Sequence, residues 1–220
     1  MATLLDPQTD TLEDLLHRLG DVSPARVRLF PSPGTAALDD LIAHNERPDT
    51  RVCEWVDGTL VEKAAGAYES WVGFILGGEL YIHLRDQDLG MIYGEAAVLR
   101  ILPKVGRAPA VAFVAWSSLP GAKPPPRSDR VPSVVPDLVI EILSHSNTPR
   151  EMARKRTEYF AAGVRVVWEV EPDTRSAVVY TAVDRATPVA TDGELDGGTV
   201  LPGFRVSLKA VFDRAGRTEA

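Results

Sequence analysis

Cysteine and long apolar runs are both scarce in this chain of 220 residues. Its single cysteine, Cys53, cannot form an intramolecular disulfide, which excludes a disulfide-stapled secreted scaffold and favours a reducing compartment. No apolar run approaches the ~20 residues that a membrane-spanning helix needs. Residues 1–6 carry no basic segment ahead of an apolar one, so no secretory signal is predicted. We therefore expect a cytoplasmic protein without a membrane partner.

Positive charge is also in deficit, because 24 Lys and Arg face 31 Asp and Glu, for a net charge of −7. This balance argues against a protein that coats nucleic acid through bulk charge, although it leaves room for an enzyme with a local basic face. The hydrophobic content of 45% is that of an ordinary globular protein. Its length allows one good-sized domain, or a core with a small appendage.

The first fifty residues are predicted to be a helical N-terminal appendage, and residues 51–215 the main domain. Thr11 and Asp14 are typical of a helix start, and leucines at helical spacing follow until Gly20. A second short helix is expected over residues 35–44. No residue of the appendage is predicted to take part in chemistry.

From residue 52 the pattern changes to short strands. Asp57-Gly58 between two β-prone runs, residues 53–56 and 59–62, predicts a hairpin. A helix is expected over residues 66–86, although two glycines inside it each cost ~1 kcal/mol. Six of the 17 prolines lie between Ser117 and Pro136 and predict a long loop. Further strands are predicted over residues 91–102, 110–116, 137–143, 165–170 and 176–181.

A second helix, over residues 149–162, carries nearly every boundary signal. Thr148 is the expected N-cap, Pro149 the first helical residue, Glu151 the partner in a capping box, and Gly163 the stop. The order of elements predicts an α/β (α+β) fold in which one mixed sheet, made of 91–102, 110–116, 137–143 and 165–170, is flanked by the two helices.

Glu141 is the sharpest candidate for chemistry, because it lies inside the apolar strand Val139-Ile140-Glu141-Ile142-Leu143. A buried carboxylate is expensive unless it is paired or bound to a metal, while a strand with one wet face would leave it in solvent. The strand alone does not decide between these two readings. The helix that follows concentrates basic residues, which suit phosphate binding but also suit a solvated helix face: Arg150, Arg154, Lys155 and Arg156.

Residue types and spacings along most of the chain match one known family. The matching stretches are Cys53-Glu54, Asp57-Gly58, Leu60 to Lys63, Val135 to Ser144, Lys155, Tyr159-Phe160, Val167-Trp168 and Leu201 to Phe204. In these stretches the chain resembles the Uma-two family of restriction endonucleases, a branch of the PD-(D/E)XK nuclease superfamily, over about residues 50–212. The resemblance implies a restriction-endonuclease-like core, DNA as partner and substrate, and a Mg²⁺ (or Mn²⁺) cofactor for phosphodiester hydrolysis.

The resemblance also assigns residues. Glu141 corresponds to the metal-binding and catalytic glutamate, and Lys155 replaces the superfamily's catalytic lysine, whose usual place is Leu143 here. Glu62 is preferred over Glu69 as an extra metal-binding carboxylate, although a surface charge at the end of a strand explains Glu62 equally well. The arginines of the basic helix, Arg150, Arg154 and Arg156, are the expected nucleic-acid contacts.

One position departs from the family. Where its pattern has Arg-x-Pro-Asp-Val-x-Phe-Val, this chain has Ala110 after Pro109, and an alanine cannot hold a metal. Asp137 is not expected to substitute, since it lies ~13 Å from Glu141 along an extended strand, and ligands of one Mg²⁺ sit ~2.0–2.1 Å from the ion. Ala110 is either natural divergence or an engineered change.

Two functions follow from this reading. The first is a metal-dependent DNA endonuclease impaired by Ala110, which would act as a homodimer if it cuts both strands of a duplex. The second is a non-catalytic module that binds nucleic acid or protein through a nuclease fold.

Overall fold

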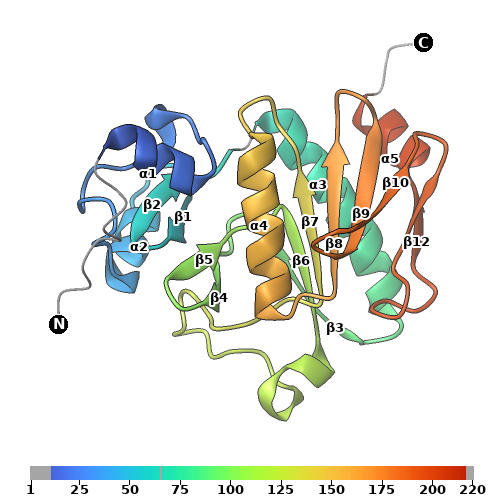
Figure 1. The fold of residues 1–220 in the computed structure, drawn as a ribbon. Helices are drawn as coiled ribbons and strands as arrows, with labels where there is room; N and C mark the ends of the chain where they lie inside the picture. Colours follow the sequence, from blue (N-terminus) through green and yellow to red (C-terminus); the bar gives the residue numbers. More distant parts are fainter. Residues whose placement is uncertain (1–10, 65, 217–220) are drawn as a thin grey trace.

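A six-stranded mixed sheet covered by one long helix on each face forms the centre of the protein (Figure 1). The computed structural model describes residues 11–64 and 66–216. Residues 1–6, on which the expected absence of a secretory signal rests, lie outside this part of the chain. The helix α3 (Ala67–Arg85) covers one face and α4 (Pro149–Ala162) the other. Both helices are confirmed close to their predicted bounds.

The strands of this sheet lie in the order β10-β9-β8-β7-β6-β3. Only β7 and β8 run parallel, because α4 connects them as a crossover helix. The bounds are β3 (Gly90–Gly94), β6 (Val111–Ala115), β7 (Leu138–Ile142), β8 (Val166–Glu171), β9 (Ser176–Ala182) and β10 (Arg185–Val189). The predicted strands 110–116, 137–143 and 165–170 therefore share one sheet, and the predicted mixed sheet flanked by two helices is confirmed.

The predicted single strand over residues 91–102 is wrong. It divides into β3 and β4 (Leu99–Leu102), which belong to different sheets. The chain turns after Gly94, where the N–H of Ala97 donates to the Gly94 carbonyl at 3.0 Å. Gly94 is an isolated glycine inside a strand pattern, which also fits a β-bulge, so the sequence pattern did not show this break.

A smaller sheet, in the order β2-β1-β5-β4, stands beside the large one. Its members β1 (Cys53–Val56) and β2 (Thr59–Glu62) form the predicted hairpin, and β5 (Val105–Arg107) joins β1 to β4. Both hairpin turn residues have positive φ, 49° at Asp57 and 73° at Gly58, as a tight two-residue turn requires.

The N-terminal segment packs on this smaller sheet (Figure 1). Helix α1 (Leu12–Leu19) has the predicted start at Thr11, which forms a capping box with Asp14, and ends at Gly20. Helix α2 (Leu38–Asn45) begins three residues later than predicted. Apolar side chains of the segment and of the hairpin form common clusters, such as that of Leu15, Leu19, Val56 and Val61.

The same segment reaches across to the start of α4. The Arg26 guanidinium donates to both carboxylate oxygens of Glu151, at 2.9 and 2.6 Å, with both side chains buried. Thr148 caps α4 as predicted, accepting from the Glu151 N–H at 2.9 Å. The other half of the predicted capping box is wrong, because Arg26 and Asn147 bind the Glu151 carboxylate.

The predicted proline-rich loop holds two short 3₁₀ turns, η2 (Trp116–Ser118) and η3 (Pro120–Ala122). A third, η1 (Pro24–Arg26), lies in the N-terminal segment. The chain continues after the large sheet through β11 (Glu194–Asp196), β12 (Arg205–Ser207) and α5 (Leu208–Ala215), which packs against α3.

None of the helices in the described ranges has both the length and the apolar composition needed to cross a bilayer.

Candidate active site

The Glu141 carboxylate lies between the large sheet and α4. Residues of β7 alternate in direction, so that Ile140 and Ile142 pack under α3 while Val139 and Glu141 face α4. Every residue of this strand is buried, and only 4% of Glu141 is exposed. The reading of a strand with one wet face is therefore excluded, and Glu141 needs partners inside the protein.

Two side chains of α4 supply those partners. The Lys155 ammonium donates to Glu141 Oε1 at 3.2 Å, and the Tyr159 hydroxyl donates to the same oxygen at 2.6 Å. Lys155 and Tyr159 are four residues apart on one helix, so they project from the same face. Burial and the nearby Glu141 charge raise the pKa of Tyr159 well above its usual value, which keeps it a proton donor. The structure thus brings together Glu141 and Lys155, as the sequence predicted.

A second carboxylate, which sequence reasoning did not select, completes this group. Glu54 of β1 is fully buried, and its Oε1 lies 3.1 Å from the Lys155 ammonium. Its Oε2 accepts from Arg107 at 2.7 Å, and Arg107 also binds Glu158 of α4. We call Glu54, Arg107, Glu141, Lys155 and Glu158 the Glu141 cluster. Glu54 shows the same sequence signal as Glu141, a lone carboxylate in an apolar strand, and could have been found by it.

The cations of the cluster hold Glu54 in the charged form. Burial alone would raise the pKa of Glu54, but the charges of Lys155 and Arg107 overcome it and lower that pKa to about 2. Burial would likewise lower the pKa of Lys155, but Glu141 and Glu54 raise it above its usual value. Each charge therefore depends on the others, as in other buried ion networks.

Lys63 adds a third buried cation beside the cluster. Its ammonium donates to the backbone carbonyls of Glu95 and Pro109, at 3.3 and 3.4 Å, and only 8% of the residue is exposed. Burial lowers its pKa, while the charge of Glu141 acts in the opposite direction. Counted with Lys63, three cations balance the three carboxylates of the cluster.

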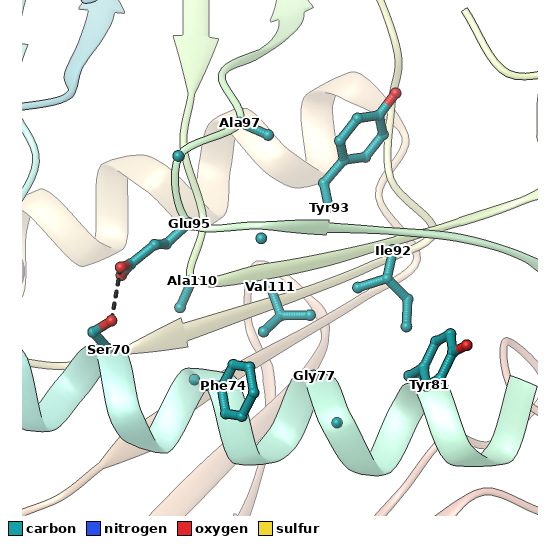
Figure 2. Close-up of a pocket in the computed structure, with 14 residues that line it drawn as sticks. Ser70, Phe74, Gly77, Tyr81, Ile92, Tyr93, Glu95, Ala97, Ala110 and Val111 are labelled. Atoms are coloured by element: carbon teal, nitrogen blue, oxygen red, sulfur yellow. Dashed lines mark hydrogen bonds between the residues drawn. The ribbon is translucent and has the colours of Figure 1, made fainter.

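Ala110 lies at the start of β6, immediately after Pro109. The register pairs Val111 with Ile140, so one further step would place Ala110 beside Glu141. Its methyl group, however, belongs to the apolar core under α3, close to Gly73, whereas the Glu141 carboxylate points toward α4. Figure 2 shows Ala110 directed toward α3.

These residues do not fit a divalent metal. In residues 11–64 and 66–216, no three His, Cys, Asp or Glu side chains converge so that they could hold a metal ion. Glu141 and Glu54 both contact the Lys155 ammonium, which would compete with Mg²⁺ for their oxygens. The donor set of this chain therefore lacks the expected site.

Glu62, the predicted extra carboxylate, is not brought to Glu141. It pairs with Cys53 across the hairpin, so it shares that residue's face of the small sheet, while Glu54 lies on the other face. Its carboxylate binds Arg28 at 2.9 Å. Glu69 is exposed. Asp137 acts as the predicted strand-start residue, accepting from the Ala115 N–H at 2.8 Å and from Ser118 at 3.0 Å.

The three arginines expected to contact nucleic acid are mostly engaged within the chain. Arg154 binds Asp57 at 2.6 Å and Glu158 at 2.7 Å, and Arg156 binds Glu169 at 2.7 Å. Arg150 is half exposed, and its Nε lies 4.0 Å from Asp21. The basic helix is therefore largely neutralised by neighbours that lie far away in sequence.

Comparison with known proteins agrees with this fold. Residues 38–209 match the Uma2 family, described as "Putative restriction endonuclease". The chain belongs to this family. No curated protein matches the chain. Among solved structures, the Uma2 chain is similar to a "putative nuclease belonging to DUF820" from Anabaena variabilis, with a TM-score of 0.65 and 16% identity over 80% of this chain and 98% of that one. At this identity the likeness shows the fold, and family membership supports a nuclease in general.

Proposed function

We propose that this chain is a cytoplasmic, DNA-directed member of its nuclease family in which metal-dependent phosphodiester hydrolysis is disabled. One observation carries the proposal: the Lys155 ammonium lies within 3.2 Å of both Glu141 and Glu54 carboxylates, where a nuclease would need free metal ligands. Ala110 removes the one further carboxylate that the family pattern would supply on the neighbouring strand.

The residues of the Glu141 cluster, together with Lys63, then have a structural role and not a catalytic one. Arg107, Lys155 and Lys63 neutralise the carboxylates and hold β1, β5, β7 and α4 together. No carboxylate of the Glu141 cluster is free to hold a metal ion that would activate a water molecule. The barrier to phosphodiester hydrolysis therefore stays near its uncatalysed height. DNA cleavage by this chain is therefore expected at background.

A nuclease assay with Mg²⁺ and Mn²⁺ tests this proposal. Ala110→Asp returns the family's carboxylate one register step from Glu141, although its Cβ faces α3. A carboxylate there that reaches the Glu141 site should raise metal-dependent cleavage at least about tenfold, a barrier change of ~1.4 kcal/mol. Adding Glu141→Ala to that variant should abolish the gain. Ala96→Asp is a matched control, because it adds a carboxylate at an exposed position in the turn after β3 and should leave cleavage at background. The proposal fails if the unaltered chain cuts DNA as fast as Ala110→Asp.

A second candidate function is a non-catalytic module that binds nucleic acid or protein. The Glu141 cluster and Lys63 together contain as many cations as carboxylates. This balance favours the second function, because a group with matched charges stabilises a fold without presenting reactive groups. If Ala110→Asp does not restore cleavage and the chain still binds DNA, this second function replaces the first. A homodimer is part of the first proposal, because a two-fold arrangement of this fold suits the two strands of a duplex.

A further inference from the structure

A cavity of about 690 Å³ opens between α3 and strand β3 and reaches Ala110 and Glu95 at one end. Figure 2 shows it between the helix and the edge of the large sheet, with Phe74 and Tyr81 on the helix and Ile92 and Val111 on the sheet. Its lining is almost entirely apolar. The polar exception is one end, where Ser70 donates to Glu95 at 2.7 Å.

Large apolar side chains stand exposed next to this cavity. Phe74 is 71% exposed and Tyr81 65%, and the Trp71 ring stacks on Phe74 with centroids 5.7 Å apart. Together with Ile82 they leave roughly 400 Å² of apolar surface open, since a buried aromatic side chain covers ~150–250 Å². Contiguous apolar patches of this size mark interaction sites. A protruding group and a cavity therefore lie side by side on one surface.

The edge strand above the cavity lacks protection. Within the described residues β3 pairs with β6 alone, and its sequence from Gly90 to Gly94 contains neither a charged residue nor a proline. The opposite edge of the same sheet, β10, carries Arg185 and Pro188. Charges and prolines are the usual devices that stop edge strands from pairing with other chains, so only one edge of this sheet is blocked.

Gly78 provides an independent observation. It lies in the middle of α3 between Phe74 and Ile82, and a Cβ added there would meet nothing within 4 Å. Nothing inside the chain therefore requires glycine, although glycine costs about 1 kcal/mol relative to alanine in a helix. A partner that packs closely against this turn of α3 would explain the residue.

We propose that a second copy of this chain docks on this surface about a two-fold axis beside β3. The two β3 strands pair antiparallel, and the exposed aromatic side chains of each copy enter the cavity of the other. A surface that holds both a protrusion and a cavity is self-complementary, which is what a two-fold interface needs. The aromatic patch alone supplies about half of the ~800 Å² per partner of a standard stable interface, and the paired edge strands add to it.

Charge argues for a second copy over nucleic acid as the occupant. The charged group lining the cavity is Glu95, and the nearby Lys63 ammonium is engaged with the Glu95 and Pro109 carbonyls. Such a surface gives no contact to a phosphate backbone. The inference rests on the homodimer of the proposed function, to which it assigns an interface, and its test does not use cleavage.

Two measurements on the full chain, without DNA or metal, test the proposal: sedimentation and hydrogen exchange. The unaltered chain should self-associate, and exchange at residues 90–94 should slow as its concentration rises. Gly78→Glu should weaken association at least about tenfold, or ~1.4 kcal/mol, while the isolated copy folds as before because the position is open. Phe74→Ser should do the same, whereas Leu12→Ser, at an exposed leucine of α1, should not.

A chain that stays monomeric at every concentration overturns the proposal. So does association that both Gly78→Glu and Phe74→Ser leave unchanged, because the contact would then use another surface. Binding of a single-stranded oligonucleotide by the monomer, abolished by Phe74→Ser, would instead assign the cavity to nucleobases. Should Phe74→Ser fail to fold, Gly78→Glu still decides. None of these outcomes depends on whether Ala110→Asp restores cleavage.

Discussion

Replacing Glu54 by glutamine measures how strongly charge holds the Glu141 cluster together. Glu54 accepts from Arg107 at 2.7 Å, lies 3.1 Å from the Lys155 ammonium, and accepts from the Ala108 N–H at 3.1 Å. Glutamine has almost the same shape, so Glu54→Gln opens no cavity. The substitution removes the negative charge that lies between Arg107 and Lys155. It also places an amide N–H₂ opposite the N–H donors of these two cations.

The pKa of Glu54 gives the expected magnitude. Although burial alone would raise that pKa, Lys155 and Arg107 lower it from 4.5 to about 2. One pKa unit corresponds to 1.36 kcal/mol, so the charged form contributes about 3 kcal/mol to the free energy of unfolding. This agrees with the ~3–5 kcal/mol lost when one partner of a buried ion pair is removed. We therefore expect Glu54→Gln to lose about 3 kcal/mol at neutral pH.

The pH dependence follows from the direction of the shift. The unfolded carboxyl binds a proton near its usual pKa of 4.5, whereas the folded one stays charged down to about pH 2. The stabilisation is complete above pH 4.5 and is lost as the pH falls toward 2. The difference in unfolding free energy between the unaltered chain and Glu54→Gln should therefore shrink below pH 4.5. Urea titrations at neutral pH and at about pH 3 measure it.

Glu46→Gln serves as the control, because Glu46 pairs with Arg130 at the surface and both side chains are about half exposed. Exposed pairs contribute at most ~1 kcal/mol. If Glu54→Gln costs no more than Glu46→Gln, or costs the same at neutral pH and about pH 3, then the cluster is not held by charge and the reasoning is refuted.

Three further outcomes are expected. Gly20→Ala should lose more than ~2 kcal/mol in urea titrations, because the residue has φ +96° and an added Cβ would lie 2.6 Å from the Glu151 backbone. Thr148→Ala should cost ~1 kcal/mol of unfolding free energy through loss of the α4 cap, in the same assay. Cys53 should resist a thiol reagent at mildly alkaline pH until the protein unfolds, because burial raises its pKa to about 12, and a fast reaction of the folded chain would contradict this.

Local signals made much of the fold predictable. The Asp57-Gly58 turn, the Thr148 cap and the Gly163 stop each act within a few residues, so the hairpin and α4 could be read from sequence. Glu141 and Lys155 were found because a lone carboxylate in an apolar strand and a family pattern pointed to both residues.

Contacts between distant segments could not be read in this way. Arg154 looked available for phosphate because its partner Asp57 lies 97 residues away in the chain. The direction of the Ala110 methyl group depends on how β6 begins beneath α3, which alternation along a strand does not specify at a strand end. Glu62 lies on the face of β2 opposite to that of the cluster, and one residue of register decides this.

The contact between Arg26 and Glu151 has a consequence for dissecting the protein. A fragment that begins after residue 50 would leave Glu151 buried at the start of α4 without its guanidinium, although Arg26 holds its pKa low in the whole chain against the effect of burial. Such a fragment must protonate that carboxyl or open the start of the helix to water. Residues 11–50 thus supply a counter-ion from within the chain. Their loss would also affect the next turns of α4, where Lys155 and Tyr159 donate to Glu141.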